Sequence, residues 1–171
     1  MAQSTFQGPV RSLSGFISQG PNTVVASAAT TAATVANNSG KITNVIATSA
    51  ITLPAVNVTA NPASSGPGQD PNTLNNLGAV YTFFLPATAT TVTITTASGD
   101  FLLGQIIIGP STGGATSMFV ANGTSTTTLT LNGTTTGGIK GSFISVVAVA
   151  ANTYMVYGKL IGSGTLATPF S

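Results

Sequence analysis

The sequence predicts an all-β protein, an antiparallel sandwich or jelly-roll-like domain with an extended N-terminal arm. Thr is the commonest residue, and with Val and Ile it supplies β-branched side chains, which favour strands over helices. Short runs alternate between polar and apolar residues, as half-buried strands do. Gly, Pro and Asn separate these runs at spacings typical of a sandwich of short strands.

The clearest strand is Thr91-Val92-Thr93-Ile94-Thr95, which places Val92 and Ile94 on one face and hydroxyls on the other. Thr128-Leu129-Thr130-Leu131 repeats this pattern. The same reasoning predicts strands over residues 42–53, 79–85, 90–96, 101–108, 116–121, 126–131, 139–149 and 153–161. The segment 22–36 is compatible with helix or strand, and a weak strand is favoured.

The length of 171 residues suits one domain with appendages. We expect an N-terminal arm over residues 1–20, an Ala/Thr-rich low-complexity segment over 21–40, and the β-domain over 41–171. A long Pro/Gly-rich loop over 54–78 interrupts this domain, and loops of that length are usually functional or disordered.

The arm carries apolar side chains near helical spacing, but Gly and Pro interrupt any helix. An extended arm is favoured over a frayed terminus, because frayed tails are seldom so rich in Phe and Leu. Its candidate partner-binding residues are Phe6, Val10, Arg11, Leu13 and Phe16.

The chain has very few groups that could perform catalysis. Lys and Arg total 4, Asp and Glu total 2, and His and Cys are absent. Proton transfer near neutral pH, thiol chemistry and hydrolytic metal sites all depend on the missing residue types. We therefore expect a non-enzymatic protein with no catalytic residue, no cofactor and no metal.

Several motifs suggest sites that the rest of the chain does not support. Residues 109–113 match the Gly-x-Ser-x-Gly pattern, but Ser111 lacks a histidine base and a turn is favoured. Residues 162–167 resemble a dinucleotide-binding fingerprint, but Pro169 and the chain end follow before the helix that would bind the pyrophosphate could begin. Asp70 and Asp100 are expected to form turns.

Two further patterns leave alternatives. Tyr154, Tyr157 and Phe143 could stack on sugars, although core and interface packing is favoured. Asn-x-Ser/Thr occurs at Asn37, Asn57, Asn122 and Asn132, but without a signal peptide none is expected to be a glycosylation site, and the last two are expected to be hairpin turns.

Charge and hydropathy argue against nucleic-acid and membrane partners. Arg11, Lys41, Lys140 and Lys159 are far apart, so they form no basic run that could follow a phosphate backbone. The longest nearly apolar stretch, 143–151, is far shorter than the ~20 residues of a membrane span. The N-terminus lacks the basic and apolar regions of a signal peptide, so the protein is expected to stay in the cytoplasm where it is made, or to leave only when the cell lyses.

The scarcity of charge also predicts self-association. An all-β protein normally protects its edge strands with Lys, Pro or bulges. This chain has few charged side chains to protect its edges. Neighbouring subunits are therefore expected to cover the exposed edges and apolar surface, most plausibly in a homotrimer.

The two ends of the chain resemble small β-rich virion structural proteins of tailed DNA phages, especially marine and cyanobacterial ones. The resemblance is carried by Thr5-Phe6-Gln7-Gly8-Pro9-Val10-Arg11-Ser12 with Gly15-Phe16, and by the C-terminal segments 141–144, 148–154 and 162–170. It covers about a third of the chain.

This resemblance implies a capsid decoration or cement protein on the capsid exterior of the virion, with the major capsid protein as partner. Such a protein would bind the outer face of the capsid lattice and stabilise the shell. The alternative is a phage fibre or host-surface module that binds glycans. A catalytic depolymerase is disfavoured, because the chain has no Glu or His.

Overall fold

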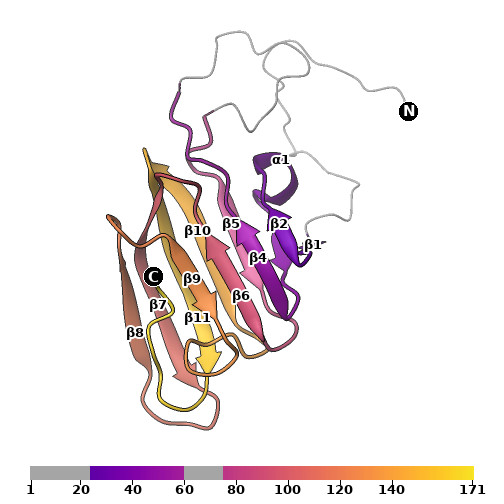
Figure 1. Ribbon diagram of the computed structural model, residues 1–171, viewed down its shortest axis with the longest axis vertical. Helices are drawn as coiled ribbons and strands as arrows, with labels where there is room; N and C mark the ends of the chain where they lie inside the picture. Colours follow the sequence, from indigo (N-terminus) through magenta and orange to yellow (C-terminus); the bar gives the residue numbers. More distant parts are fainter. Residues whose placement is uncertain (1–23, 60–74) are drawn as a thin grey trace, which may run out of the picture.

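The computed structural model describes residues 24–59 and 75–171, which form two packed β-sheets (Figure 1). Within these ranges, sheet A has seven strands in the order β1-β3-β5-β10-β11-β7-β8, and sheet B has four in the order β2-β4-β6-β9. The predicted all-β sandwich is confirmed. The strands are β1 (Val24–Ala26), β2 (Thr30–Ala32), β3 (Ile42–Asn44), β4 (Thr48–Thr52), β5 (Val80–Phe84), β6 (Thr91–Thr95), β7 (Phe101–Pro110), β8 (Ser117–Asn122), β9 (Thr128–Leu131), β10 (Phe143–Ala150) and β11 (Thr153–Gly162).

The sheets are mixed, where antiparallel pairs alone were expected. From β1 to β6 the chain alternates between the sheets, so β1, β3 and β5 pair in parallel, as do β2, β4 and β6. β11 also pairs in parallel with β7, whereas β10 is antiparallel to both β5 and β11. Period-2 alternation predicts which face of a strand is buried but not the direction of its neighbours.

The predicted strand over 42–53 is two strands in different sheets. β3 lies in sheet A and β4 in sheet B, and the chain crosses between them at Val45, whose side chain is fully buried. Ala47 then accepts a hydrogen bond from the Thr90 N–H at 2.7 Å, which ties this crossing to the next one. Residues 42–53 contain no Gly or Pro that would mark the corner in the sequence.

The segment 22–36 was left open between helix and strand, and its described part contains both. β1 and β2 extend the two sheets, and α1 (Val35–Asn38) makes a single turn. Thr34 caps that turn, because its side chain accepts a hydrogen bond from the Asn37 N–H at 3.1 Å.

The core lies between the sheets and is built from the inward residues of every long strand. Val92 and Ile94 point inward as predicted and are 0% and 1% exposed. Gly104 in β7 has a φ of 136°, and a Cβ there would lie 2.2 Å from the Val156 carbonyl oxygen of β11. Only glycine therefore permits the close pairing of β7 with β11.

The two sheets end differently at β9 and β8. The C-terminal residues cover the outer edge of β9: Thr128 N–H donates to the Ser171 carbonyl at 2.9 Å and Thr130 N–H to the Pro169 carbonyl at 2.7 Å. In the described part of the chain, no strand pairs with the outer edge of β8. Sheet A therefore offers an uncovered edge, and sheet B is closed on that side.

Candidate binding face

The outer face of sheet A carries large apolar side chains that are partly exposed. Along β7 and β11, buried residues largely alternate with more exposed ones, so every second side chain points away from sheet B. In β10 the outward positions run from exposed Phe143 through buried Ser145 to half-buried Val147. Ten of these outward side chains in the described sheet expose 36% to 63% of their surface: Val24, Ile42, Phe84, Leu103, Ile107, Met118, Val120, Phe143, Met155 and Tyr157.

The strand register arranges these side chains in rows across the face. One row crosses five strands as Phe84, Phe143, Lys159, Ile107 and Met118. A parallel row runs through Val80, Val147, Met155 and Leu103. The row between them is more polar and consists of Thr82, Ser145, Tyr157, Gln105 and Val120. Two mainly apolar rows therefore cross the face, and the more polar row lies between them.

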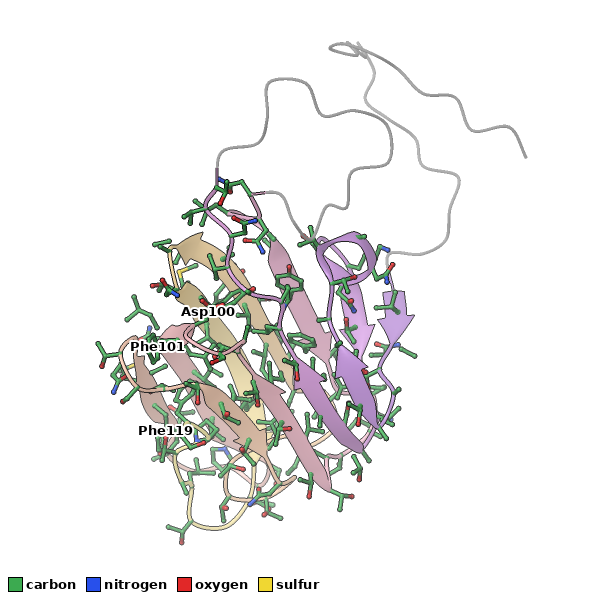
Figure 2. All side chains as sticks on the ribbon, turned by 45° about the horizontal axis from the view of Figure 1, so that its top comes forward. Asp100, Phe101 and Phe119 are labelled. Carbon is green, nitrogen blue, oxygen red and sulfur yellow. The ribbon has the colours of Figure 1, made fainter. Side chains whose placement is uncertain are left out.

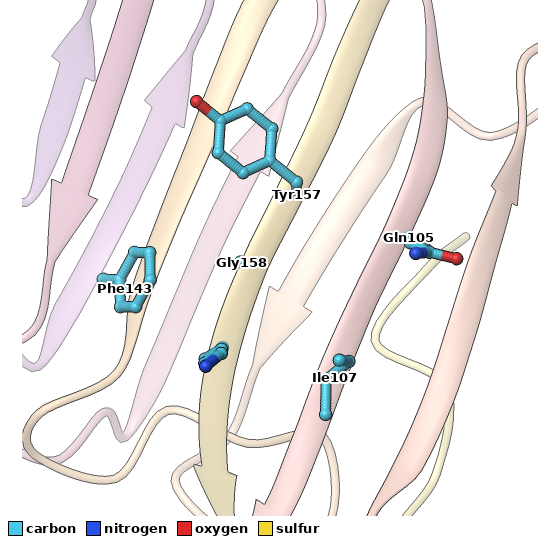
Figure 3. Close-up of a pocket in the computed structure, with 6 residues that line it drawn as sticks. Gln105, Ile107, Phe143, Tyr157 and Gly158 are labelled. Carbon is cyan, nitrogen blue, oxygen red and sulfur yellow. The ribbon is translucent and has the colours of Figure 1, made fainter.

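A hollow of about 250 Å³ lies within this face. Figure 3 shows Phe143 on β10 and Tyr157 on β11 at one side, with Ile107 and Gln105 of β7 at the other. The remaining lining residues are Gly158 and Lys159. The hollow thus combines two exposed aromatic rings with one cation and one amide.

The predicted aromatic trio divides between the core and this face. Tyr157 and Phe143 are 43% and 39% exposed, whereas Tyr154 is fully buried. The Tyr154 hydroxyl donates to the Pro54 carbonyl at 2.7 Å, and burial raises its pKa, with smaller contributions from Tyr81 and Asp100. Tyr154 therefore cannot serve a surface platform with the other two.

Tyr81 packs against Tyr154 in the core, with ring centroids 6.3 Å apart and an edge-to-face angle of 71°. Its hydroxyl is buried without a hydrogen-bond partner among the described residues. Burial raises the pKa of Tyr81 to about 12. Neither tyrosine is placed for proton transfer, because both hydroxyls are held neutral inside the sandwich.

Asp100 lies in the turn between β6 and β7, where it is 2% exposed (Figure 2). Its carboxylate accepts from the Val56 N–H at 2.8 Å and from the Asn152 side-chain amide at 3.3 Å. Asn76 similarly joins both described ends of the long loop, because its side chain contacts Asn57 N and Ala55 O at 2.8 Å each. The buried side chains of Asp100 and Asn76 therefore hold neighbouring loops in place. Asp70 lies outside the described residues.

The remaining sequence motifs form turns. Ser111 lies in the β7–β8 turn, where its N–H donates to the Gly162 carbonyl at 2.8 Å. Residues 163–171 form no helix, so the dinucleotide-like segment 162–167 has no helix N-terminus that could bind a phosphate. Asn122 and Asn132 each begin a turn and accept backbone N–H bonds from residues two and four positions later. Both turns share an Asn-Gly-Thr-x-Thr repeat at 122–126 and 132–136, a sequence signal that the predicted Asn-Gly turns left unused.

The outer face of sheet B contrasts with that of sheet A. Its outward positions hold only Thr and Ala: Thr30, Ala32, Thr48, Ala50, Thr52, Thr91, Thr93, Thr95, Thr128 and Thr130. Thr95 and Thr128 hydroxyls contact each other at 3.2 Å across β6 and β9. This face is hydroxyl-covered and has no large side chain on its strands.

The predicted arm residues Phe6, Val10, Arg11, Leu13 and Phe16 lie outside the described residues. Over residues 24–59 and 75–171, no three acidic, His or Cys side chains gather as a metal site. The same ranges contain no helix long and apolar enough to span a membrane. No protein-family model, curated protein or solved structure matches this chain.

Proposed function

We propose that this is a non-enzymatic virion structural protein, a capsid decoration protein that binds the outer face of the major capsid lattice and stabilises the shell. The apolar outer face of sheet A carries the proposal for a role within an assembly. Large apolar patches on a protein surface mark sites of interaction. The choice of a phage capsid as that assembly rests on the resemblance of the chain ends to virion proteins.

The chemistry of the described residues supports binding rather than turnover. Asp100 is committed to loop contacts, and the buried tyrosines are held neutral. A cement protein needs only many weak contacts, which repetition over subunits converts into avidity. The proposed arm would link the sandwich to a capsid subunit through Phe16 and the neighbouring apolar residues.

Adding purified protein to phage heads stripped of it tests this function. We expect saturable binding to heads, and we expect Phe16→Ala to reduce occupancy strongly, because a central aromatic anchor commonly contributes about 2 kcal/mol or more. Arg11→Ala should reduce occupancy partially and increase its salt sensitivity.

A second variant provides the matched control. Deleting residues 1–17 should abolish attachment while leaving the melting transition of the sandwich intact, since β1 begins at Val24 and all described strands remain. Wild-type occupancy by Phe16→Ala would contradict attachment through the arm. Absence of the protein from phage heads would contradict the decoration function itself.

The hollow on sheet A supports one alternative, a glycan-binding module of a phage fibre. Exposed Phe143 and Tyr157 could stack on a sugar ring, while Gln105 and Lys159 offer hydrogen-bond donors. This function requires the hollow to stay open in the assembled protein. Localisation to the tail and loss of glycan binding in Tyr157→Ala would favour it over decoration.

A further inference from the structure

We infer that Asn122 is a site of spontaneous chemical modification by deamidation, whereas Asn132, with the same residues after it, is protected by the fold. Asn122 begins the first turn, residues 122–126, and Asn132 begins the second turn, residues 132–136. These two residues form the Asn-Gly pairs of the chain. The inference concerns the chemistry of the chain itself, so it does not depend on the proposed function.

Deamidation requires water and a deprotonated backbone nitrogen, and no other reactant. The nitrogen of the following glycine gives its proton to solvent and attacks the Asn Cγ atom. A nitrogen–carbon bond forms, and the side-chain amide takes up a proton and leaves as ammonia. Water then opens the five-membered ring at either carbonyl and yields aspartate or isoaspartate. Asn is a thermolabile residue in general, and glycine favours ring closure because it has no Cβ to hinder the attack.

Both turns oppose this reaction in the same way while they are closed. In each turn the Asn Oδ1 atom accepts N–H bonds from the residues two and four positions later, at 2.9 to 3.2 Å. The glycine N–H donates at 2.8 Å to a carbonyl, that of Leu102 in the first turn and that of Gly137 in the second. The carboxamide is therefore fixed and the attacking nitrogen is occupied. Reaction requires local opening, so its rate follows the fraction of molecules in which the turn is open.

The C-terminal segment clamps the middle of the second turn. Ser163 N–H donates to the Thr134 carbonyl at 3.0 Å, and Ala167 N–H donates to the Thr135 carbonyl at 2.9 Å. Gly133, which supplies the attacking nitrogen, is buried. Opening the second turn therefore disrupts bonds to a distant part of the chain as well as those within the turn.

The first turn is held only at its two ends. Both ends are tied to Leu102, whose carbonyl and N–H each form a 2.8 Å hydrogen bond with the turn. Among the described residues, Thr124 and Ser125 form hydrogen bonds only with the Asn122 side chain. Gly123 is half-buried, whereas its counterpart in the second turn is buried. The middle of the first turn is therefore held by the reacting side chain itself.

The strands that lead into the two turns differ in the same direction. Within the described chain, β8 pairs only with β7, whereas β9 pairs with β6 and is covered on its other side by the C-terminal residues (Figure 1). A strand at an open edge has fewer bonds to break, so it separates at a lower free energy than a strand with neighbours on both sides. The strand pairing and the turn contacts both indicate that the first turn opens more often.

Modification would change the charge and the main chain at the edge of sheet A. One new carboxylate lowers the formal net charge from +2 to +1. Aspartate at position 122 keeps an oxygen acceptor for the turn, whereas isoaspartate adds a methylene group to the main chain and displaces Gly123 from Leu102. Either product places a negative charge beside β8, which has no charged side chain of its own. Charge at a strand edge opposes pairing with another strand.

Peptide mapping of the folded full-length chain tests the inference. Chymotryptic cleavage after Phe119, Leu131 and Phe143 places the two Asn residues on separate peptides for mass spectrometry. In the folded chain, Asn122 should deamidate at least about 10-fold faster than Asn132. Both rates should rise with pH, because the glycine nitrogen must lose its proton. In denaturant the two rates should be nearly equal, since Gly-Thr follows both residues, and this comparison controls for the local sequence.

Three variants sharpen the test, with circular dichroism to establish that each is folded. Asn122→Gln should remove the acidic species that isoelectric focusing detects on storage, and the matched Asn132→Gln should retain it. Ala167→Pro removes one N–H of the clamp and should raise the Asn132 rate alone. An unchanged Asn132 rate in folded Ala167→Pro would overturn the protective role of the clamp.

The wild-type chain decides the inference even where a variant does not fold. Equal rates at the two sites in the folded chain, or a faster rate at Asn132, would overturn it. The absence of conversion at Asn122 over a period in which the denatured chain converts fully would also overturn it.

Discussion

The two sheets have similar inner faces and very different outer faces. Inside, both present fully buried Ile, Leu and Val, such as Ile94 in sheet B and Ile106 in sheet A. Outside, the strands of sheet B carry Thr and Ala, whereas sheet A exposes Phe, Tyr, Met and Ile. In a chain with 4% charged residues, threonine hydroxyls provide the solvation that Lys and Glu supply elsewhere. The outer face of sheet A lacks this hydroxyl covering and exposes large apolar side chains, as surfaces that contact another protein commonly do.

The largest expected effect comes from substituting an inner residue of β6, compared with an outer residue of the same strand. Ile94→Thr removes buried apolar volume and adds a buried hydroxyl, so the free energy of unfolding should fall by about 2–4 kcal/mol. Thr93→Ile changes the solvated face of the same strand and should alter this free energy by about 0.5 kcal/mol or less. Denaturant titration measures both, and equal losses would contradict the assignment of the two faces.

A smaller effect distinguishes the two core tyrosines. Tyr154→Phe removes the hydrogen bond to the Pro54 carbonyl and leaves that oxygen unpaired, so stability should fall by about 1–2 kcal/mol. Tyr81→Phe removes a buried hydroxyl that has no described partner and should raise stability by up to about 1 kcal/mol. Chemical denaturation of the two variants provides the measurement. A comparable loss in Tyr81→Phe would show that its hydroxyl is satisfied in solution.

The pH dependence of stability should be weak until the alkaline range. Burial raises the pKa of Tyr81 to about 12 in the folded chain, compared with about 10 when unfolded. Between these values the unfolded chain has lost the phenolic proton while the folded chain retains it, so rising pH favours unfolding. Tyr81 alone should contribute a loss on the order of 2 kcal/mol across this window, and Tyr154, whose pKa burial also raises, should add to it. Denaturant midpoints measure the total, which should be smaller in Tyr81→Phe. A flat profile above pH 10 would contradict the burial of this hydroxyl.

The inner and outer faces of individual strands could be predicted from the sequence, but the connections between strands could not. Thr91-Val92-Thr93-Ile94-Thr95 alternates so regularly that its buried face is evident, and the structure confirms it. Apolar Val45 is predicted to lie within a strand, yet it lies at the corner where the chain crosses between the sheets. Parallel pairing depends on contacts between distant segments such as β7 and β11, which a local pattern does not encode.

The candidate face was only partly accessible to sequence reasoning. Phe143 and Tyr157 could be singled out as aromatic, but Tyr154 could be assigned to the core only once the strand register was known. Ile107 and Met118 carry no sequence signal that separates an exposed apolar residue from a buried one. They lie in one row only because β11, β7 and β8 pair in a particular order.

Thiol labelling tests the contrast between the two faces most directly, because the chain contains no Cys and any introduced thiol reports on one position. Gln105→Cys places a thiol in the sheet A face, and Thr52→Cys places one on the outer face of sheet B; both positions are exposed in the single chain. At concentrations where the protein is assembled, Thr52→Cys should react like a free thiol. Gln105→Cys should be protected at least about 10-fold and recover its reactivity on dilution. Equal and rapid labelling of both thiols at every concentration would contradict the prediction that neighbouring subunits cover exposed apolar surface such as the sheet A face.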